Sequence, residues 1–61
     1  MPYVKIELFS GRTKEQKAEI AKEITDTLQR HAGAAVEATS IVFQDVERDN
    51  WANAGKLMSE R

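Results

Sequence analysis

Hydrophobic and polar residues alternate at the start of the chain, over residues 2–9. One face of this segment is aliphatic and carries Val4, Ile6 and Leu8. The other face is polar in its centre but has Tyr3 and Phe9 near its ends. A period of two predicts a half-buried β-strand. The Ser-Gly-Arg sequence at residues 10–12 is typical of a turn that ends it.

The spacing of hydrophobic residues changes over residues 14–32 and predicts an α-helix there. Apolar positions repeat at helical spacing, at Ile20, Ala21, Ile24, Thr27, Leu28 and Ala32. Thr13 and Gln16 have the spacing of a capping box, in which each side chain bonds the backbone N–H of the other residue. Gly33 is well placed to end the helix in a left-handed conformation. The opposite face is charged and expected to be solvated, with Asp26 and Arg30 spaced to pair.

A second strand is predicted over residues 39–46, after a connector at residues 34–38. Its centre is Ile41-Val42-Phe43, and three consecutive apolar residues favour burial on both faces. Strand, helix and strand with short connections predict an α/β (α+β) fold, a βαβ protomer whose two strands are parallel and joined by a right-handed crossover. The remaining residues predict a short C-terminal hairpin or loop. In it, Trp51 is expected to pack against a neighbouring subunit, because an indole in a polar loop needs apolar contact.

The size of the chain predicts a homo-oligomer. Its 61 residues make one domain, residues 1–61, and a chain of this size buries only about 60% of its unfolded surface. There is no cysteine and a single histidine, so disulfides are excluded and a structural zinc site is disfavoured. Two strands are too few to be stable in water. One helix covers one face of such a sheet, so we expect copies of the chain to join the sheets and cover the other face.

The net charge and the hydropathy of the chain argue against two classes of partner, nucleic acids and membranes. The net charge is -1, and no basic cluster with interleaved aromatic residues is present, which argues against a nucleic-acid partner. No apolar run approaches the roughly 20 residues that a membrane helix needs, and no signal peptide opens the chain. A cytoplasmic protein without membrane association is the expectation.

The proline that follows the initiator methionine has two interpretations. Pro2 lacks a backbone N–H, and a proline is tolerated at the first residue of a strand for that reason alone. The chemical interpretation begins with removal of Met1, which is usual before a small residue. Pro2 would then carry a secondary amine on a rigid ring held by a strand. Such an amine can accept and return protons if burial lowers its pKa toward neutrality.

The chain resembles the short-chain members of the 4-oxalocrotonate tautomerase family over nearly its whole length. The similarity is carried by the start, Met1-Pro2-Tyr3-Val4-Lys5-Ile6, by Gly11-Arg12-Thr13-Lys14-Glu15-Gln16-Lys17 before and within the predicted helix, and by Trp51 and Gly55. The resemblance implies a βαβ protomer, dimers that join sheets, and commonly a hexamer built as a trimer of dimers. It also implies proton transfer without a cofactor or a metal, on a small carboxylic acid with an enol or dienol group.

The same resemblance implies roles for single residues. Pro2 would be the catalytic base and proton shuttle, and Arg12 would hold a substrate carboxylate. Trp51 would form the apolar wall that keeps the amine neutral. The physical chemistry agrees, because desolvation and a nearby guanidinium both disfavour a cationic amine, and a guanidinium grips a carboxylate through two hydrogen bonds. Without that resemblance, Arg12 is also explained as a surface turn residue.

One substrate-binding position departs from the family. Ser40 stands where well-known members carry a second arginine, and a hydroxyl cannot replace a cation. Arg48 is the candidate for supplying a positive charge from another direction. Two alternatives to a tautomerase therefore stay open. One is a hydratase, dehalogenase or decarboxylase that uses a protonated proline and a carboxylate from Asp45, Glu47 or Asp49. The other is a non-catalytic oligomeric module.

Overall fold

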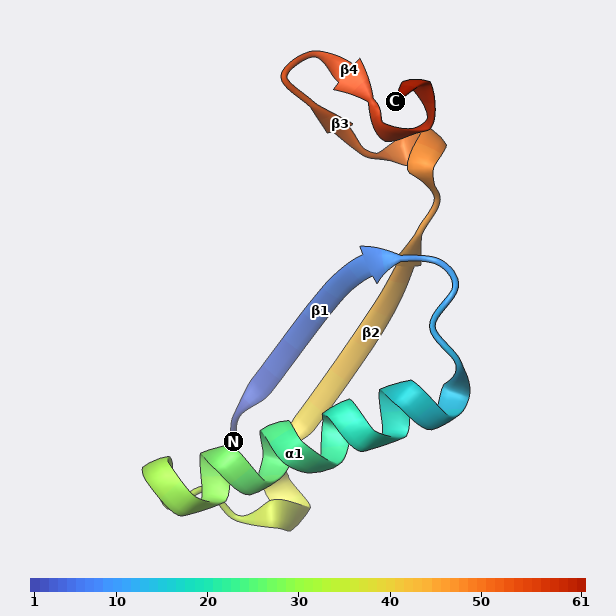
Figure 1. Cartoon of the computed structure of the whole chain (residues 1–61). Coiled ribbons are helices and arrows are strands. Elements are labelled where there is room, and N and C mark those ends of the chain that lie inside the picture. The colour runs from blue at the N-terminus through green and yellow to red at the C-terminus, as the bar shows by residue number, and fades with distance from the viewer.

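The computed structural model describes residues 1–61 as a βαβ unit followed by a small hairpin (Figure 1). Its elements are β1 (Tyr3–Phe9), α1 (Lys14–Ala32), β2 (Ser40–Val46), β3 (Ala52–Asn53) and β4 (Lys56–Leu57). Single 3₁₀ turns lie at Val36–Ala38, Arg48–Asn50 and Met58–Glu60. The predicted order of strand, helix, strand and C-terminal hairpin is confirmed.

The strands β1 and β2 are parallel, as the short connections require. Their register runs from Tyr3 opposite Ser40 to Phe9 opposite Val46. The ladder continues beyond the first pair, because the Ser40 N–H donates to the Pro2 carbonyl at 3.0 Å. At the other end, the Ser10 N–H donates to the Val46 carbonyl at 3.2 Å. Residues that precede both strands therefore meet at one edge of the unit, and residues that follow both strands meet at the opposite edge.

The helix begins and ends where its capping residues predict. The Thr13 hydroxyl accepts from the Gln16 N–H at 3.0 Å, and the Gln16 side-chain oxygen accepts from the Thr13 N–H at 2.8 Å. Both bonds satisfy N–H groups that the first turn of a helix leaves free. Gly33 ends the helix with φ 67°, a left-handed conformation that glycine adopts without a steric penalty. Asp26 and Arg30 form the expected ion pair at 2.8 Å.

The face that α1 turns toward the strands differs in part from the predicted stripe. Its half-buried side chains are Lys17, Ile20, Ala21, Ile24, Thr25 and Leu28. Thr27 and Ala32 were expected on this face, but both are exposed. Thr27 lies on the flank of the stripe, and Ala32 is the last helical residue, where α1 runs past the start of β1 (Figure 1).

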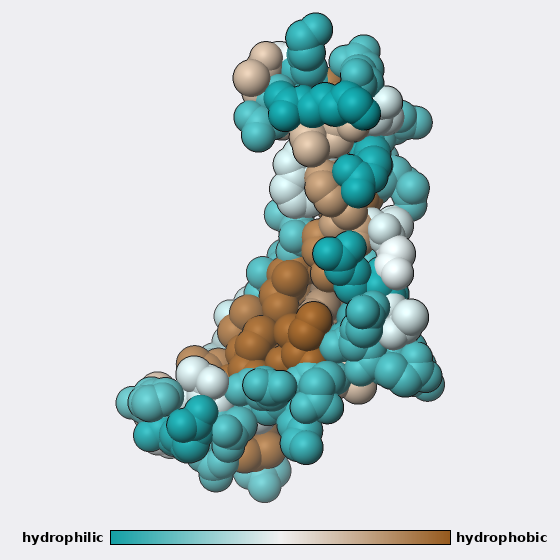
Figure 2. Space-filling view, viewed as in Figure 1, coloured by the Kyte–Doolittle hydropathy of each residue, from teal (hydrophilic) through white to brown (hydrophobic).

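No residue of the isolated chain is fully buried. The hydrophobic side chains gather between α1 and the strands and remain open on the face seen in Figure 2. On the sheet face away from this cluster, Tyr3 is 63% and Val42 41% exposed. One face of β2 is therefore open in the single chain, and its burial on both faces stays a prediction for the assembled protein. The chain is also thin, with extents of 42 × 24 × 14 Å. A closed core can form only if further molecules cover these surfaces.

The C-terminal hairpin stands beyond the end of β2 (Figure 1). Ala52 pairs with Leu57 and Asn53 with Lys56, and the two residues between them, Ala54 and Gly55, both have positive φ. Positive φ at both central residues is typical of two-residue hairpin turns, because their twist matches the twist of the paired strands. The hairpin is tied to the preceding turn, since the Met58 N–H donates to the Trp51 carbonyl at 2.7 Å. Among the helices, none has the length and apolar character that crossing a membrane requires.

Candidate active site

Pro2 lies at the edge from which both strands start. It is half-buried, and its carbonyl accepts the hydrogen bond from the Ser40 N–H, so the residue is fixed to β2 before β1 begins. Ser40, the position expected to bind substrate, is thus its direct neighbour across the ladder. Met1 in front of it is 97% exposed. Removal of Met1 would therefore free the Pro2 nitrogen while leaving this residue in place.

Arg12 lies at the opposite edge, in the exposed turn between β1 and α1. The seven residues of β1 separate it from Pro2, a span of about 20 Å along an extended strand. A single chain does not bring the two predicted site residues together. Within one chain, Arg12 therefore lies too far from Pro2 to contact its nitrogen.

Trp51 lies at the same edge as Arg12, just beyond β2. Its indole packs against Phe9, with ring centroids 4.6 Å apart and planes tilted by 53°. The guanidinium of Arg48 lies over the same phenyl ring, with Cζ 4.3 Å from its centroid. Trp51 was expected to find its packing partner on a neighbouring subunit, but the last residue of its own β1 supplies one. We call Phe9, Arg48 and Trp51 the aromatic cluster.

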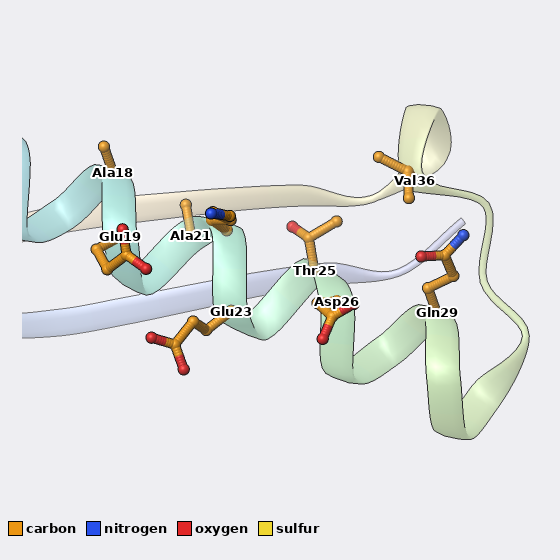
Figure 3. A pocket seen from close by; sticks show the side chains of 9 residues that line it. Ala18, Glu19, Ala21, Glu23, Thr25, Asp26, Gln29 and Val36 are labelled. Carbon is orange, nitrogen blue, oxygen red and sulfur yellow. The ribbon is translucent and has the colours of Figure 1, made fainter.

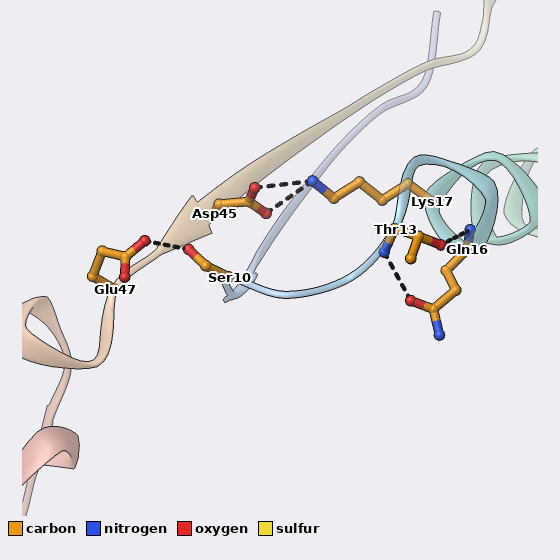
Figure 4. A network of polar contacts seen from close by, with 6 residues as sticks. All are labelled: Ser10, Thr13, Gln16, Lys17, Asp45 and Glu47. Atoms are coloured by element: carbon orange, nitrogen blue, oxygen red, sulfur yellow. Dashed lines mark hydrogen bonds and ion pairs between the residues drawn. The ribbon is translucent and has the colours of Figure 1, made fainter.

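A polar network fixes the turn that carries Arg12 (Figure 4). The Ser10 hydroxyl donates to a Glu47 carboxylate oxygen at 2.6 Å, which links the end of β1 to the segment after β2. In the first turns of α1, the Lys17 ammonium pairs with the Asp45 carboxylate at 2.9 Å. Asp45 and Glu47 therefore both bind side chains of this chain and help to fix the turn between β1 and α1. Asp49, the third candidate carboxylate for water activation, forms no such bond.

Sequence reasoning missed the contributions of Phe9, Ser10 and Lys17 to this edge. The alternation predicts only that Phe9 lies on the outer face of its strand, and the turn signal predicts only a loop position for Ser10. The signal was present in the parallel pairing, which places the residues after β1 beside those after β2. The length of the connection to Trp51 gave no indication that the chain would fold back onto Phe9.

The hollows on the chain do not enclose the predicted site. The largest, of about 700 Å³, follows the flank of α1 toward Val36 and is lined by Ala18, Ala21 and Thr25 among others (Figure 3). Two smaller hollows lie beside the aromatic cluster, one of about 260 Å³ next to Arg48 and one of about 290 Å³ next to Trp51. Pro2 lines none of them. No group of three His, Asp or Glu side chains is arranged to hold a metal ion.

Comparison with known proteins identifies the family. The family model described as tautomerase enzyme matches residues 2–61. A probable tautomerase of Lactococcus lactis is 46% identical over 61 residues and covers all of both chains. The 2-hydroxymuconate tautomerase of Bacillus subtilis is 33% identical over 60 residues, which is 98% of this chain and 97% of that protein.

Solved structures give the same result. The crystal structure of a homologue of 4-oxalocrotonate tautomerase superposes with a TM-score of 0.93 at 32% identity, over 98% of both chains. A heterohexameric 4-oxalocrotonate tautomerase from Chloroflexus aurantiacus superposes with a TM-score of 0.90 at 27% identity, over 98% of this chain and 97% of that one. The present chain belongs to the 4-oxalocrotonate tautomerase family of the tautomerase superfamily and is an isomerase of tautomerase type.

Proposed function

We propose that the chain, once Met1 is removed, is a cofactor-independent tautomerase with Pro2 as its general base. Its substrate would be a small 2-hydroxy-dienoate or enol-pyruvate type acid, and the name of the 2-hydroxymuconate tautomerase relative supports this class. The observation that carries the proposal is the anchoring of Pro2. Its carbonyl is bonded to β2 at 3.0 Å while the residue before it is 97% exposed, so the freed amine would have a fixed position.

The Pro2 nitrogen would take one proton from the substrate oxygen and return it to a substrate carbon. The neutral Pro2 nitrogen accepts the proton of the enol hydroxyl, and the oxygen lone pair forms the carbonyl as the double bond shifts along the chain. The protonated ring then returns the proton to a carbon of the conjugated system, which restores the neutral amine. Arg12 would hold a carboxylate, because its guanidinium stays charged and can donate two parallel hydrogen bonds. Ser40, beside Pro2, would offer a hydroxyl to a substrate oxygen.

The complete site would combine several copies of the chain. Pro2 and Ser40 lie at one edge, and Arg12 and Trp51 at the other, so the four meet only where the edge of one copy adjoins the opposite edge of another. The absence of any fully buried residue also favours assembly. We propose a hexamer built as a trimer of dimers, an arrangement that the hexameric relative from Chloroflexus aurantiacus supports.

The alternative of a hydratase, dehalogenase or decarboxylase is less well supported. That chemistry needs a carboxylate free to activate water. Asp45 is paired with Lys17, and Glu47 accepts from Ser10, which leaves Asp49 as the remaining candidate.

The test begins with the intact mass of the purified protein, to establish that Met1 is absent. Turnover of 2-hydroxymuconate is then followed by the loss of its dienol absorbance. Replacing Pro2 with alanine is expected to lower kcat at least about 100-fold, in the range that positioned acid–base groups contribute. An unchanged rate would contradict the role of Pro2 as base.

A second preparation provides a matched control. A chain with one residue added before Pro2 keeps the ring and the strand but turns its nitrogen into an amide, and it should be as inactive as Pro2→Ala. If the correctly processed protein turns over no enol acid, the non-catalytic module is the better description of the chain.

A further inference from the structure

Arg48 lies over the Phe9 ring and has no acidic partner. Its guanidinium lies over the Phe9 ring, and Trp51 packs against that ring as well. The chain has two ion pairs, Lys17 with Asp45 and Arg30 with Asp26, and Arg48 takes part in neither. A guanidinium that stacks on a ring is attracted through its positive charge. The N–H groups in its plane remain free to donate hydrogen bonds. Arg48 therefore keeps the capacity to bind a carboxylate.

The carboxylate nearest in sequence is occupied elsewhere. Glu47 accepts the Ser10 hydroxyl at 2.6 Å and so faces the turn after β1. Arg12 follows that turn and likewise forms no ion pair. The Ser10–Glu47 bond thus holds the turn that carries Arg12 beside the segment that carries Arg48, at the edge that also holds Trp51.

We propose that Arg48 is a specificity-determining residue that binds a second carboxylate of the substrate. The inference deepens the proposed function, since it takes Trp51 as the wall of the site. A substrate carboxylate held by Arg12 would leave the far end of a dicarboxylate near the aromatic cluster, where Arg48 offers a planar, permanently charged fork. This chain would thereby retain a dicarboxylate preference although Ser40 supplies no cation.

The direction of approach follows from the neighbouring charges. The hollow of about 260 Å³ beside Arg48 is also lined by Glu47 and Asp49, which repel an anion. A carboxylate would therefore reach Arg48 along the edge of the Phe9–Trp51 pair. The stacking on Phe9 also limits the freedom of the long Arg48 side chain, which reduces the entropy lost on binding.

The test is an equilibrium measurement that needs no turnover. Two unreactive six-carbon dienes serve as probes: trans,trans-muconate, with two carboxylates, and sorbate, with one. Binding to the processed oligomer is measured by titration calorimetry. The wild-type protein is expected to bind muconate about tenfold more tightly than sorbate, as one further charge-assisted contact would give. Arg48→Gln is expected to remove this preference while leaving sorbate affinity unchanged.

Two further variants identify the cause. Arg48→Lys keeps the charge without the planar fork and should retain only part of the preference. Arg30→Gln makes the same charge change in the last turn of α1, far from the Phe9–Trp51 pair, and should leave both affinities unchanged. The fluorescence of Trp51, the only tryptophan, checks that its contact with Phe9 survives each substitution.

The outcomes separate this inference from the proposed function. If Arg48→Gln leaves the ratio of muconate to sorbate affinity unchanged, or if the wild type binds neither probe, the inference is wrong. Failure of the tautomerase assay with the preference for muconate intact would instead refute the catalytic role of Pro2 and leave Arg48 as an anion-binding residue.

Discussion

The Ser10 hydroxyl donates to the Glu47 carboxylate at 2.6 Å and joins the segments that follow the two parallel strands. This bond spans 37 positions in the sequence and fixes the start of the turn that presents Arg12. A side-chain bond at the surface contributes little to stability, but here it limits where a substrate-binding arginine can lie.

The first prediction concerns this bond. Ser10→Ala and Glu47→Ala are each expected to raise KM about twofold to fivefold, in line with the modest net energy of an exposed hydrogen bond, with kcat nearly unchanged. The double variant should be no worse than either single variant, because both remove the same interaction. Steady-state kinetics of all four proteins provide the measurement. Strictly additive effects would show that the two residues act independently.

The second prediction concerns the helix cap. Thr13→Ala removes the acceptor for the Gln16 N–H and is expected to lower the free energy of unfolding by about 1 kcal/mol. Thr27→Ala is the matched control, since Thr27 is exposed in the helix interior and alanine is the better helix former there. Denaturant unfolding at one fixed protomer concentration compares them. An equal loss in both variants would exclude the cap as the cause.

The third prediction is the pH dependence of the reaction. A general base must be deprotonated, so kcat/KM for tautomerisation should rise with pH through the pKa of the Pro2 amine and then level off. A reaction that uses the protonated amine as an acid would fall over the same interval. The pH–rate profile of processed wild-type protein therefore distinguishes a tautomerase from the hydratase alternative. The protein with one residue added before Pro2, whose ring nitrogen is an amide, should lose the ascending limb when measured in parallel.

The fourth prediction tests the uncovered sheet face. Val42 is 41% exposed in the single chain, and a second copy would bury it. Val42→Lys is expected to shift the oligomer toward smaller species and to lower Tm, because an unpaired ammonium would then be buried. Val42→Thr keeps the shape of the side chain and should show a smaller effect. Light scattering over a range of concentrations measures both, and an unchanged mass with lysine would place Val42 outside every interface.

Local patterns predicted the elements well. The helix begins after Thr13 and ends at Gly33, as the capping box and the C-terminal glycine indicate. The alternation around Val4, Ile6 and Leu8 predicted the strand and its half-buried face. These signals are reliable because they involve hydrogen bonds and side-chain directions within a few residues of each other.

Predictions that depended on the direction of a side chain were less accurate. Thr27 and Ala32 have helical spacing, but Thr27 lies on the flank of the stripe and Ala32 beyond the start of β1. Thr25 and Lys17 are half-buried in their place. Hydrophobic periodicity defines a stripe, whereas the position and length of the opposing surface decide which of its residues are covered.

The sequence by itself determined the βαβ order, the caps of its helix, the need for further copies, and the identity of Pro2, Arg12, Ser40 and Trp51 as candidates. Only the tertiary structure decided their grouping. Parallel pairing places Pro2 with Ser40 at one edge and Arg12 with Trp51 at the other, and it seats Trp51 and Arg48 on Phe9. The reason is physical: caps and alternation are properties of neighbouring residues, whereas the meeting of distant residues depends on strand register and on the path of the chain after the sheet.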